Sequence, residues 1–216
     1  MTPDKREKVM KMQFVEKSIV AFTDDLAAKT PVPGGGGASA LVAALGTALG
    51  GMVGNFTVGK PKYAAVEEDM QALLARGEAL RGKLLSCIDR DAEAFEPLSR
   101  AYGIPREDPQ RPAVLEQCLK EAAAVPMEIL RLACEAIELH AAYAQKGSAM
   151  MLSDVGTGVA FCWSALYGAA LNVRVNTKLM KDRSYAQTLD REVEERMEQY
   201  REMAEQVYQT VYQRIC

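Results

Sequence analysis

The chain has 216 residues, which is enough for one large domain with a buried core. Apolar residues make up 49% of it and charged residues 25%, as in ordinary globular proteins. The net charge of −3 gives no basic surface for nucleic acid or an anionic membrane, so neither is expected as a partner. We predict a single domain over residues 1–216.

Five cysteines are scattered along the chain without a Cys-x-x-Cys pair. An odd, unpatterned set predicts reduced thiols in the cytoplasm rather than disulfides or a zinc site. Residues 1–13 are charged and lack the apolar core of a signal peptide, which agrees with a cytoplasmic location. His140 is the single histidine and falls on an apolar helix stripe, so we expect a packed side chain and no metal site.

The first predicted element is an amphipathic helix over residues 14–29. Val15, Ile19, Phe22 and Leu26 step by four, three and four, which is the spacing of one helix face. The prolines that follow should end this helix, because proline lacks an N–H and clashes with the preceding turn.

The stretch from Pro31 to Ala40 holds two prolines and four consecutive glycines, which predict a stiff loop before a helix over residues 38–56. Free N–H groups at such a helix start suit an anionic or carbonyl-bearing ligand. The alternative is a tight turn between two helices that binds nothing. Gly46, Gly50 and Gly54 share one face of the helix and allow another backbone to approach closely.

The rest of the chain predicts four more helices and one long proline-rich loop over residues 97–112. Pro126 lies inside one of these helices and should kink it. No segment predicts a strand. The expected fold is therefore all-α: an antiparallel bundle of about six mostly long helices without a sheet. The four helices are expected over residues 63–95, 113–145, 150–179 and 183–216.

Two segments lack charge altogether, Thr30–Gly59 and Val155–Val173. A helix that is apolar on all sides belongs in a bilayer or at the centre of a bundle or dimer. Both segments carry several small polar residues and neither has a strong basic flank, so we predict buried core helices. Their burial favours an oligomer.

Four polar positions stand out as candidates for chemistry. Asp91 falls on an apolar helix stripe, where a carboxylate is costly unless it is functional or joined to a cation in a buried salt bridge. Asp154 lies in the first turn of a predicted helix, where it either reacts or caps the helix. Asn172 and Asn176 share a face, and their amides either bind a planar heterocycle or satisfy helix ends.

Antiparallel stacking divides the candidates between the two ends of the bundle. The glycine stretch, Asp91, Asn172 and Asn176 fall at one end. Asp154 precedes Asn172 by 18 residues in one helix, or roughly 27 Å. The bundle therefore has two polar clusters, unless an antiparallel dimer joins them. The other end carries Lys60, Lys62, Tyr63, Lys146, Ser153 and Asp154.

Five sequence blocks in this order resemble the cyclodeaminase/cyclohydrolase family. The resemblance implies an all-helical homodimer that acts on a one-carbon derivative of tetrahydrofolate, with or without a polyglutamate tail, and needs no metal or cofactor beyond the folate. The blocks are Thr30–Ala40, Thr57–Tyr63, Asp91–Phe95, Lys146-Gly147 with Ser153-Asp154, and Leu171–Asn176.

The resemblance also implies roles for individual residues. A carboxylate, Asp91 or Asp154, stabilises the cationic one-carbon centre and takes a proton from water, and Lys60 returns a proton to the leaving nitrogen. Lysines also suit the glutamate tail of folates. The substrate-binding residues implied are Pro33, Gly34, Gly35, Gly36, Ser39, Tyr63, Lys146, Asn172 and Asn176.

Two positions depart from the family pattern. Gly37 stands where the family usually has serine, and Ser148 where it usually has asparagine. Without a serine at position 37, we expect Ser39 to supply the helix cap or the hydrogen bond to the ligand. Without an asparagine at position 148, the substrate contacts of the turn after Lys146-Gly147 are in question. We expect hydrolysis of 5,10-methenyltetrahydrofolate, because the chain carries no formiminotransferase segment. The alternatives are formiminotetrahydrofolate cyclodeaminase activity and a folate-binding or dimeric helical protein without turnover.

Overall fold

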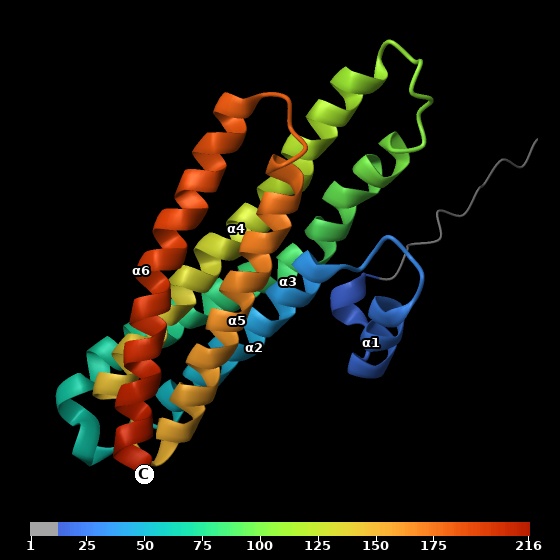
Figure 1. The fold of residues 1–216 in the computed structure, drawn as a ribbon. Coiled ribbons are helices and arrows are strands. Elements are labelled where there is room, and N and C mark those ends of the chain that lie inside the picture. Colours follow the sequence, from blue (N-terminus) through green and yellow to red (C-terminus); the bar gives the residue numbers. More distant parts are fainter. Residues whose placement is uncertain (1–12) are drawn as a thin grey trace, which may run out of the picture.

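The computed structural model describes residues 13–216, which form helices without any strand, as the sequence predicts. Five long helices lie roughly antiparallel, and a short helix stands beside one end of them (Figure 1). Most of the charged segment 1–13 lies outside the described residues. The α-helices are α1 (Ile19–Ala27), α2 (Gly35–Asn55), α3 (Glu67–Ala101), α4 (Arg111–Lys146), α5 (Leu152–Thr177) and α6 (Arg183–Ile215); the 3₁₀ turns are η1 (Phe14–Glu16), η2 (Pro61–Val66) and η3 (Ala149–Met151).

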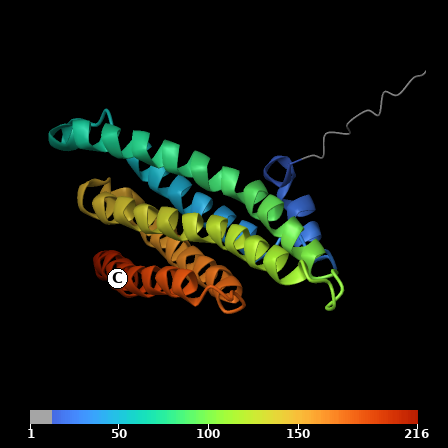
Figure 2. The same ribbon diagram turned by 90° about the horizontal axis from the view of Figure 1, so that it is seen from above.

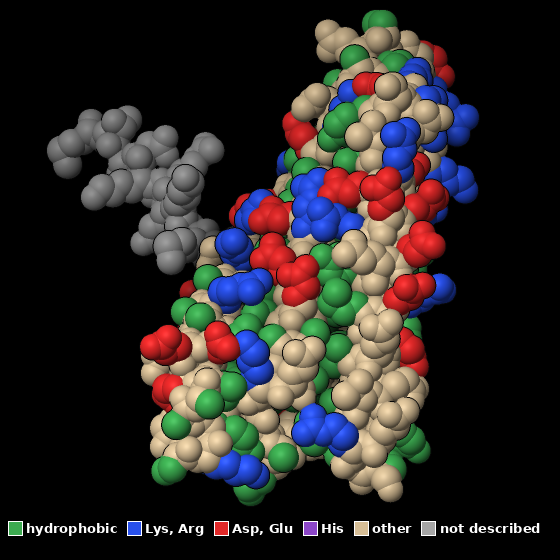
Figure 3. Space-filling view, turned by 90° about the vertical axis from the view of Figure 1, so that its left-hand side faces the viewer, with side chains coloured by type: hydrophobic (Ala, Val, Ile, Leu, Met, Phe, Trp, Pro, Cys, Tyr) green, Lys and Arg blue, Asp and Glu red, His purple; other side chains and the backbone are tan. Residues whose placement is uncertain are grey.

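The two uncharged segments become the central helices α2 and α5, which pack along each other. α4 packs against both, α3 covers α2, and α6 covers α5. Seen from above, α3 lies on one side of the molecule, α4 in the middle and α6 on the other side (Figure 2). Charged side chains cluster across the face shown in Figure 3, as expected for the solvent side of the outer helices.

The glycine stretch does not form the loop that its composition predicts. α2 begins at Gly35, so three of the four glycines make its first turn. The N–H of Gly37 donates to Asp91 of α3 at 2.9 Å, and a carboxylate at a helix N-terminus stabilises it through the helix dipole. This contact offsets the poor helix propensity of glycine.

The glycine face of Gly46, Gly50 and Gly54 is packed within one chain. The predicted close approach of another helix backbone is confirmed at Gly46, where a β-carbon would lie 2.8 Å from the carbonyl oxygen of Gly158 on α5, whereas side chains fill the space at Gly50 and Gly54. A β-carbon on Gly46 would lie 2.6 Å from the sulfur of Cys162 on α5. One on Gly50 would lie 2.8 Å from the ring of Tyr143 on α4, and one on Gly54 2.6 Å from a Leu74 methyl carbon on α3. The face therefore packs three other helices against α2.

His140 is packed in this core, as predicted, with 1% of its surface exposed. Its Nε2 lies 2.9 Å from the carbonyl oxygen of Gly46. Burial lowers the pKa of the imidazole to about 4, so the ring is neutral at neutral pH.

The predicted N-terminal helix is shorter than expected. The chain forms η1 and then α1, which starts after Ser18, whose hydroxyl accepts the N–H of Ala21 at 3.1 Å. Of the predicted stripe only Phe22 is buried, and Ile19 is 79% exposed. Local periodicity correctly predicted a helix here, but most of the predicted apolar face is exposed, because no long helix packs over α1.

Helix α3 continues to Ala101, through Pro97, where the prediction ended the helix. Leu98 and Ala101 are buried in a second apolar cluster with Leu119 of α4, and this burial offsets the backbone hydrogen bond that the proline removes. Pro126 lies inside α4, as predicted.

Two helical segments, Gly35–Asn55 and Ala149–Thr177, are long and apolar enough to cross a membrane. About half of each is buried by the rest of the chain (56% and 50% of the most apolar window). The remaining apolar side chains of these helices, Leu45 and Leu171 among them, face outward.

Substitutions on the glycine face of α2 should separate packing from helix propensity. We expect Gly46→Ala to lower the free energy of unfolding by about 1–3 kcal/mol, because its methyl group collides with Cys162 and the carbonyl of Gly158. Gly51→Ala is the control: a β-carbon there meets nothing within 4 Å, and the change should stabilise α2 by up to about 1 kcal/mol. Urea unfolding measures both, and equal effects would contradict this packing.

Candidate active site

A cavity of about 150 Å³ opens where the start of α2 meets the later parts of α3 and α5 and the middle of α4. It is smaller than drug-sized sites, which measure roughly 300–1,000 Å³, so it has room for only part of a ligand of that size. Among the residues that the structure describes, Asp91 is the one charged residue that lines it. The lining residues are Pro31, Val32, Gly34, Gly35, Gly36, Asp91, Phe95, Ala122, Pro126, Asn172, Val175 and Asn176.

Asp91 is wedged against the first turn of α2. Its Oδ2 accepts the N–H of Gly37 at 2.9 Å, and a β-carbon on Gly36 would lie only 2.2 Å from Oδ1. Gly36 therefore cannot carry a side chain while the carboxyl group keeps this place. No lysine or arginine lines the described cavity, so a buried salt bridge does not explain Asp91.

Burial raises the pKa of Asp91 to about 6, and the hydrogen bond from the backbone of Gly37 opposes this rise. A carboxyl group with such a pKa exchanges protons near neutral pH, which suits a general acid and base. The first turn of α2 also presents the N–H groups of Gly35 and Gly36, which have no acceptor within the helix. The cavity thus combines one carboxyl group with backbone donors.

The two asparagines project from the last turns of α5 toward this cavity. Asn172 donates from Nδ2 to the carbonyl of Gly168 at 2.8 Å. Asn176 donates from Nδ2 to the carbonyls of Asn172 at 2.8 Å and Ala122 at 3.3 Å. Asn176 has both amide N–H groups engaged by backbone and so offers its oxygen to a ligand as an acceptor, whereas Asn172 uses one N–H and keeps the other as well as its oxygen.

Two other predicted binding residues lie beside the cavity but do not line it. Pro33 is buried between Val32 and Gly34, and its peptide bond to Val32 is cis. Ser39 is buried against Gly168, and its hydroxyl donates to the carbonyl of Gly35 at 2.7 Å. Ser39 therefore stabilises the first turn of α2 from inside.

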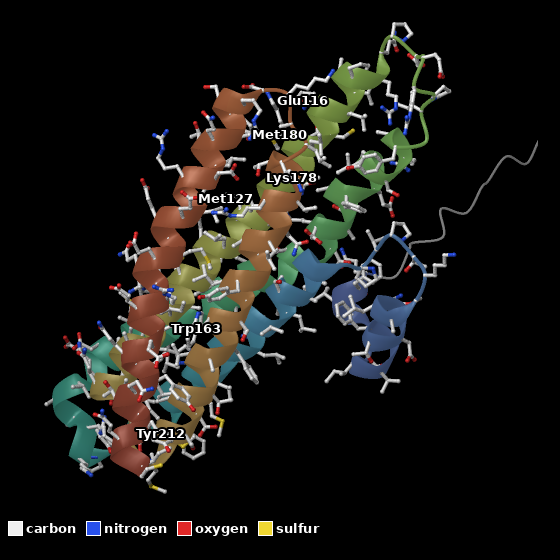
Figure 4. All side chains as sticks on the ribbon, in the orientation of Figure 1. Glu116, Met127, Trp163, Lys178, Met180 and Tyr212 are labelled. Carbon is white, nitrogen blue, oxygen red and sulfur yellow. The ribbon has the colours of Figure 1, made fainter. Side chains whose placement is uncertain are left out.

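The remaining candidates lie at the opposite end of the bundle, as the antiparallel arrangement predicts. Figure 4 labels Lys178, two residues beyond Asn176, toward one end of α5, and Tyr212, which shares a groove with Ser153, at the other. Asp154 lies in the first turn of α5. One chain alone does not bring this residue to Asp91.

A small polar cluster forms at that far end. The hydroxyl of Tyr63 accepts the N–H of Ala149 at 3.1 Å, and this bond lowers the pKa of the phenol. Lys146 pairs with Asp69, and the Lys60 ammonium lies 5.7 Å from the centre of the Phe56 ring. Lys60 and Lys146 thus remain near the surface.

The sequence predictions did not include Phe95, Pro126, Ala122 and Val175 among the site residues, although all four line the cavity. Phe95 had a usable signal, because it follows Asp91 by four residues and so shares its helix face. Pro126 was noted only as a kink. The contributions of Ala122 and Val175 depend on how the helices pack.

The titration of Asp91 should appear in the stability of the fold. Its pKa is higher in the folded chain than in the unfolded chain, so its protonated form favours folding below about pH 4 and this contribution is lost as pH rises through 6. We expect the free energy of unfolding of Asp91→Asn to exceed that of wild type by roughly 2 kcal/mol at pH 8 and to differ little from it at pH 4. Urea unfolding at both values measures this; a constant difference would contradict it.

Comparisons with known proteins agree with the predicted resemblance. The family model described as formiminotransferase-cyclodeaminase matches residues 18–195. A methenyltetrahydrofolate cyclohydrolase from Methylorubrum extorquens is 39% identical over 203 residues, which cover 92% of this chain and 98% of that protein. A formimidoyltransferase-cyclodeaminase from Dictyostelium discoideum is 32% identical over 197 residues, or 91% of this chain, but the match spans only 36% of that longer protein.

A solved structure extends the likeness to the fold. The crystal structure of formiminotetrahydrofolate cyclodeaminase from Thermotoga maritima matches with a TM-score of 0.79 and 31% sequence identity, covering 92% of this chain and 96% of that chain. The matched family segment contains all of α2, α3, α4 and α5, which build the cavity. The chain is therefore a member of the formiminotransferase-cyclodeaminase family.

Proposed function

We propose that this protein is an enzyme that hydrolyses 5,10-methenyltetrahydrofolate to 10-formyltetrahydrofolate. The observation that carries the proposal is the carboxyl group of Asp91, held against a helix start in a cavity that no cationic side chain of residues 13–216 lines. The 39% identical relative named as a cyclohydrolase, matched along 98% of its length, supports the choice of reaction. No cofactor beyond the folate is proposed.

The chemistry follows from the charge of the substrate. The methenyl carbon joins two nitrogens in a planar cation, which an ionised Asp91 stabilises. Water adds to this carbon and gives one proton to Asp91. The neutral adduct then breaks its bond to the ring nitrogen, which takes the proton from Asp91, while the hydroxyl proton leaves to solvent as the formyl group forms. A pKa of about 6 allows the carboxyl group to serve in both steps.

The first turn of α2 contributes to the same step. Gly35 and Gly36 line the cavity at the positive end of the helix dipole, where their N–H groups suit the developing formyl oxygen. In this arrangement Asp91 replaces Lys60 as the proton donor to the leaving nitrogen. Lys60 and Asp154 retain a role only if a second copy brings them to the cavity.

We also propose that the protein is a cytoplasmic homodimer formed through α2 and α5. Leu45 and Met52 of α2 and Leu171 and Val175 of α5 are 41–69% exposed although both helices are almost free of charge. A second copy packed antiparallel would cover this face. It would also bring the polar cluster of Lys60, Tyr63 and Lys146 in one chain toward the cavity of the other chain. Lys60 and Lys146 would then suit the glutamate tail of a folate too large for the cavity.

Formiminotetrahydrofolate cyclodeaminase activity is the second candidate, favoured by the Thermotoga maritima structure. In ring closure of a formimino group the second ring nitrogen adds to the carbon and ammonia leaves, which forms the same type of cationic carbon between two nitrogens, so Asp91 can serve it. A folate-binding protein without turnover is the alternative of another class, since Gly37 and Ser148 depart from the family pattern.

The reaction is tested by following the ultraviolet absorbance of methenyltetrahydrofolate with and without the protein, and then with formiminotetrahydrofolate. We expect hydrolysis above the buffer rate, and at least a tenfold lower kcat for Asp91→Asn, because its amide cannot take the proton. Asp154→Asn in parallel shows whether the far end takes part. Two flat traces would leave only the binding protein, and an unchanged rate in Asp91→Asn would remove carboxylate catalysis at the cavity.

The dimer is tested by sedimentation velocity. We expect wild type to sediment as a dimer and Leu171→Glu, which places a charge on the exposed apolar face, to sediment as a monomer with reduced turnover. Gln206→Glu on the exposed side of α6 is the control and should remain a dimer. A wild-type monomer that turns over folate would overturn the shared site.

A further inference from the structure

The side chain of Asn176 is held in one orientation. It is 6% exposed, lines the cavity, and engages both N–H groups of its amide with backbone carbonyls, one on its own helix and one on α4. An amide with both N–H groups occupied can offer only its oxygen to a third partner. Asn176 therefore presents a fixed acceptor, Oδ1, in the cavity that Asp91 also lines.

The carbonyl on α4 that holds Asn176 belongs to Ala122, four residues before Pro126. In an α-helix this carbonyl would accept the N–H of residue 126. Proline has no N–H, so the oxygen of Ala122 has no partner within α4. The nitrogen of Asn176 takes the place of the missing donor.

We propose that Pro126 is a positioning residue: by leaving the carbonyl of Ala122 unoccupied, it fixes Asn176 so that Oδ1 accepts a hydrogen bond from an N–H or O–H donor in the cavity. The donor belongs to the folate or to the attacking water. This step rests on the proposed function. It explains why an interior proline, which weakens a helix, occurs where α4 borders the cavity.

Pro126→Ala tests this proposal because the two effects of the change run in opposite directions. The new N–H bonds the carbonyl of Ala122 and makes α4 a more regular helix, so the melting temperature should rise. Asn176 loses its anchor, and kcat/KM for methenyltetrahydrofolate should fall about tenfold. A purely structural role would lower activity only together with stability.

Pro97→Ala is the matched control. Pro97 is also an interior helix proline, but it does not line the cavity, and its substitution restores a bond to Glu93 on α3. We expect an equal or higher melting temperature with unchanged kcat/KM. If Pro97→Ala loses as much activity as Pro126→Ala, the effect is not specific to Asn176 and the proposal is wrong.

A double-mutant cycle shows whether Pro126 acts through Asn176. In an Asn176→Ala background, Pro126→Ala should cause no further loss of kcat/KM, whereas independent effects would multiply. A full additional tenfold loss would overturn the proposal.

A readout without turnover separates this proposal from the proposed function. The side-chain amide signals of Asn176, assigned by NMR through their loss in Asn176→Asp, should show slow exchange with solvent in wild type and faster exchange in Pro126→Ala. If they stay protected in Pro126→Ala, Pro126 does not hold Asn176, whatever the activity. If the exchange behaves as expected but wild type turns over neither folate, the reaction assignment fails and the positioning device stands.

Discussion

The contact between the carboxyl group of Asp91 and the first turn of α2 organises the functional end of this molecule. The N–H of Gly37 binds the carboxylate, and the missing side chain of Gly36 gives it room. This contact lets a run of glycines start a helix. The same position at the helix start leaves Asp91 half-buried, and this burial raises its pKa to about 6 although the hydrogen bond from Gly37 opposes the rise. One position therefore serves folding and the proposed chemistry together.

The remaining walls of the cavity depend on how rigidly the long helices pack. The glycine face of α2 brings α3, α4 and α5 within contact of its backbone, and His140 ties α4 to α2 through the carbonyl of Gly46. Asparagines on α5 and the proline on α4 then meet near the start of α2. The site stands on helices rather than on mobile loops, which favours fixed geometry.

Much of this arrangement is encoded in local pattern. Apolar spacing predicted the six helices, and the order of the helices placed Asp91, Asn172 and Asn176 at the glycine end and Asp154 at the other. The errors lie where tertiary contacts override local preference. Gly35–Gly37 became helical because of Asp91, and α3 passed through Pro97 because Leu98 and Ala101 are buried beyond it. The bond from Asn176 to Ala122 joins residues 54 apart in sequence, and local periodicity carries no signal for it.

The small volume of the cavity has a consequence for selectivity. A cavity of about 150 Å³ is smaller than drug-sized sites, so under the proposed function only the reacting part of the folate enters it. The rest of the ligand, which is attached to this reacting part, must then be recognised on a separate surface with its own affinity. A longer or shorter attached part then changes how long the ligand stays bound but does not disturb the bond-breaking step. Residence time and the rate of bond breaking are therefore free to evolve independently.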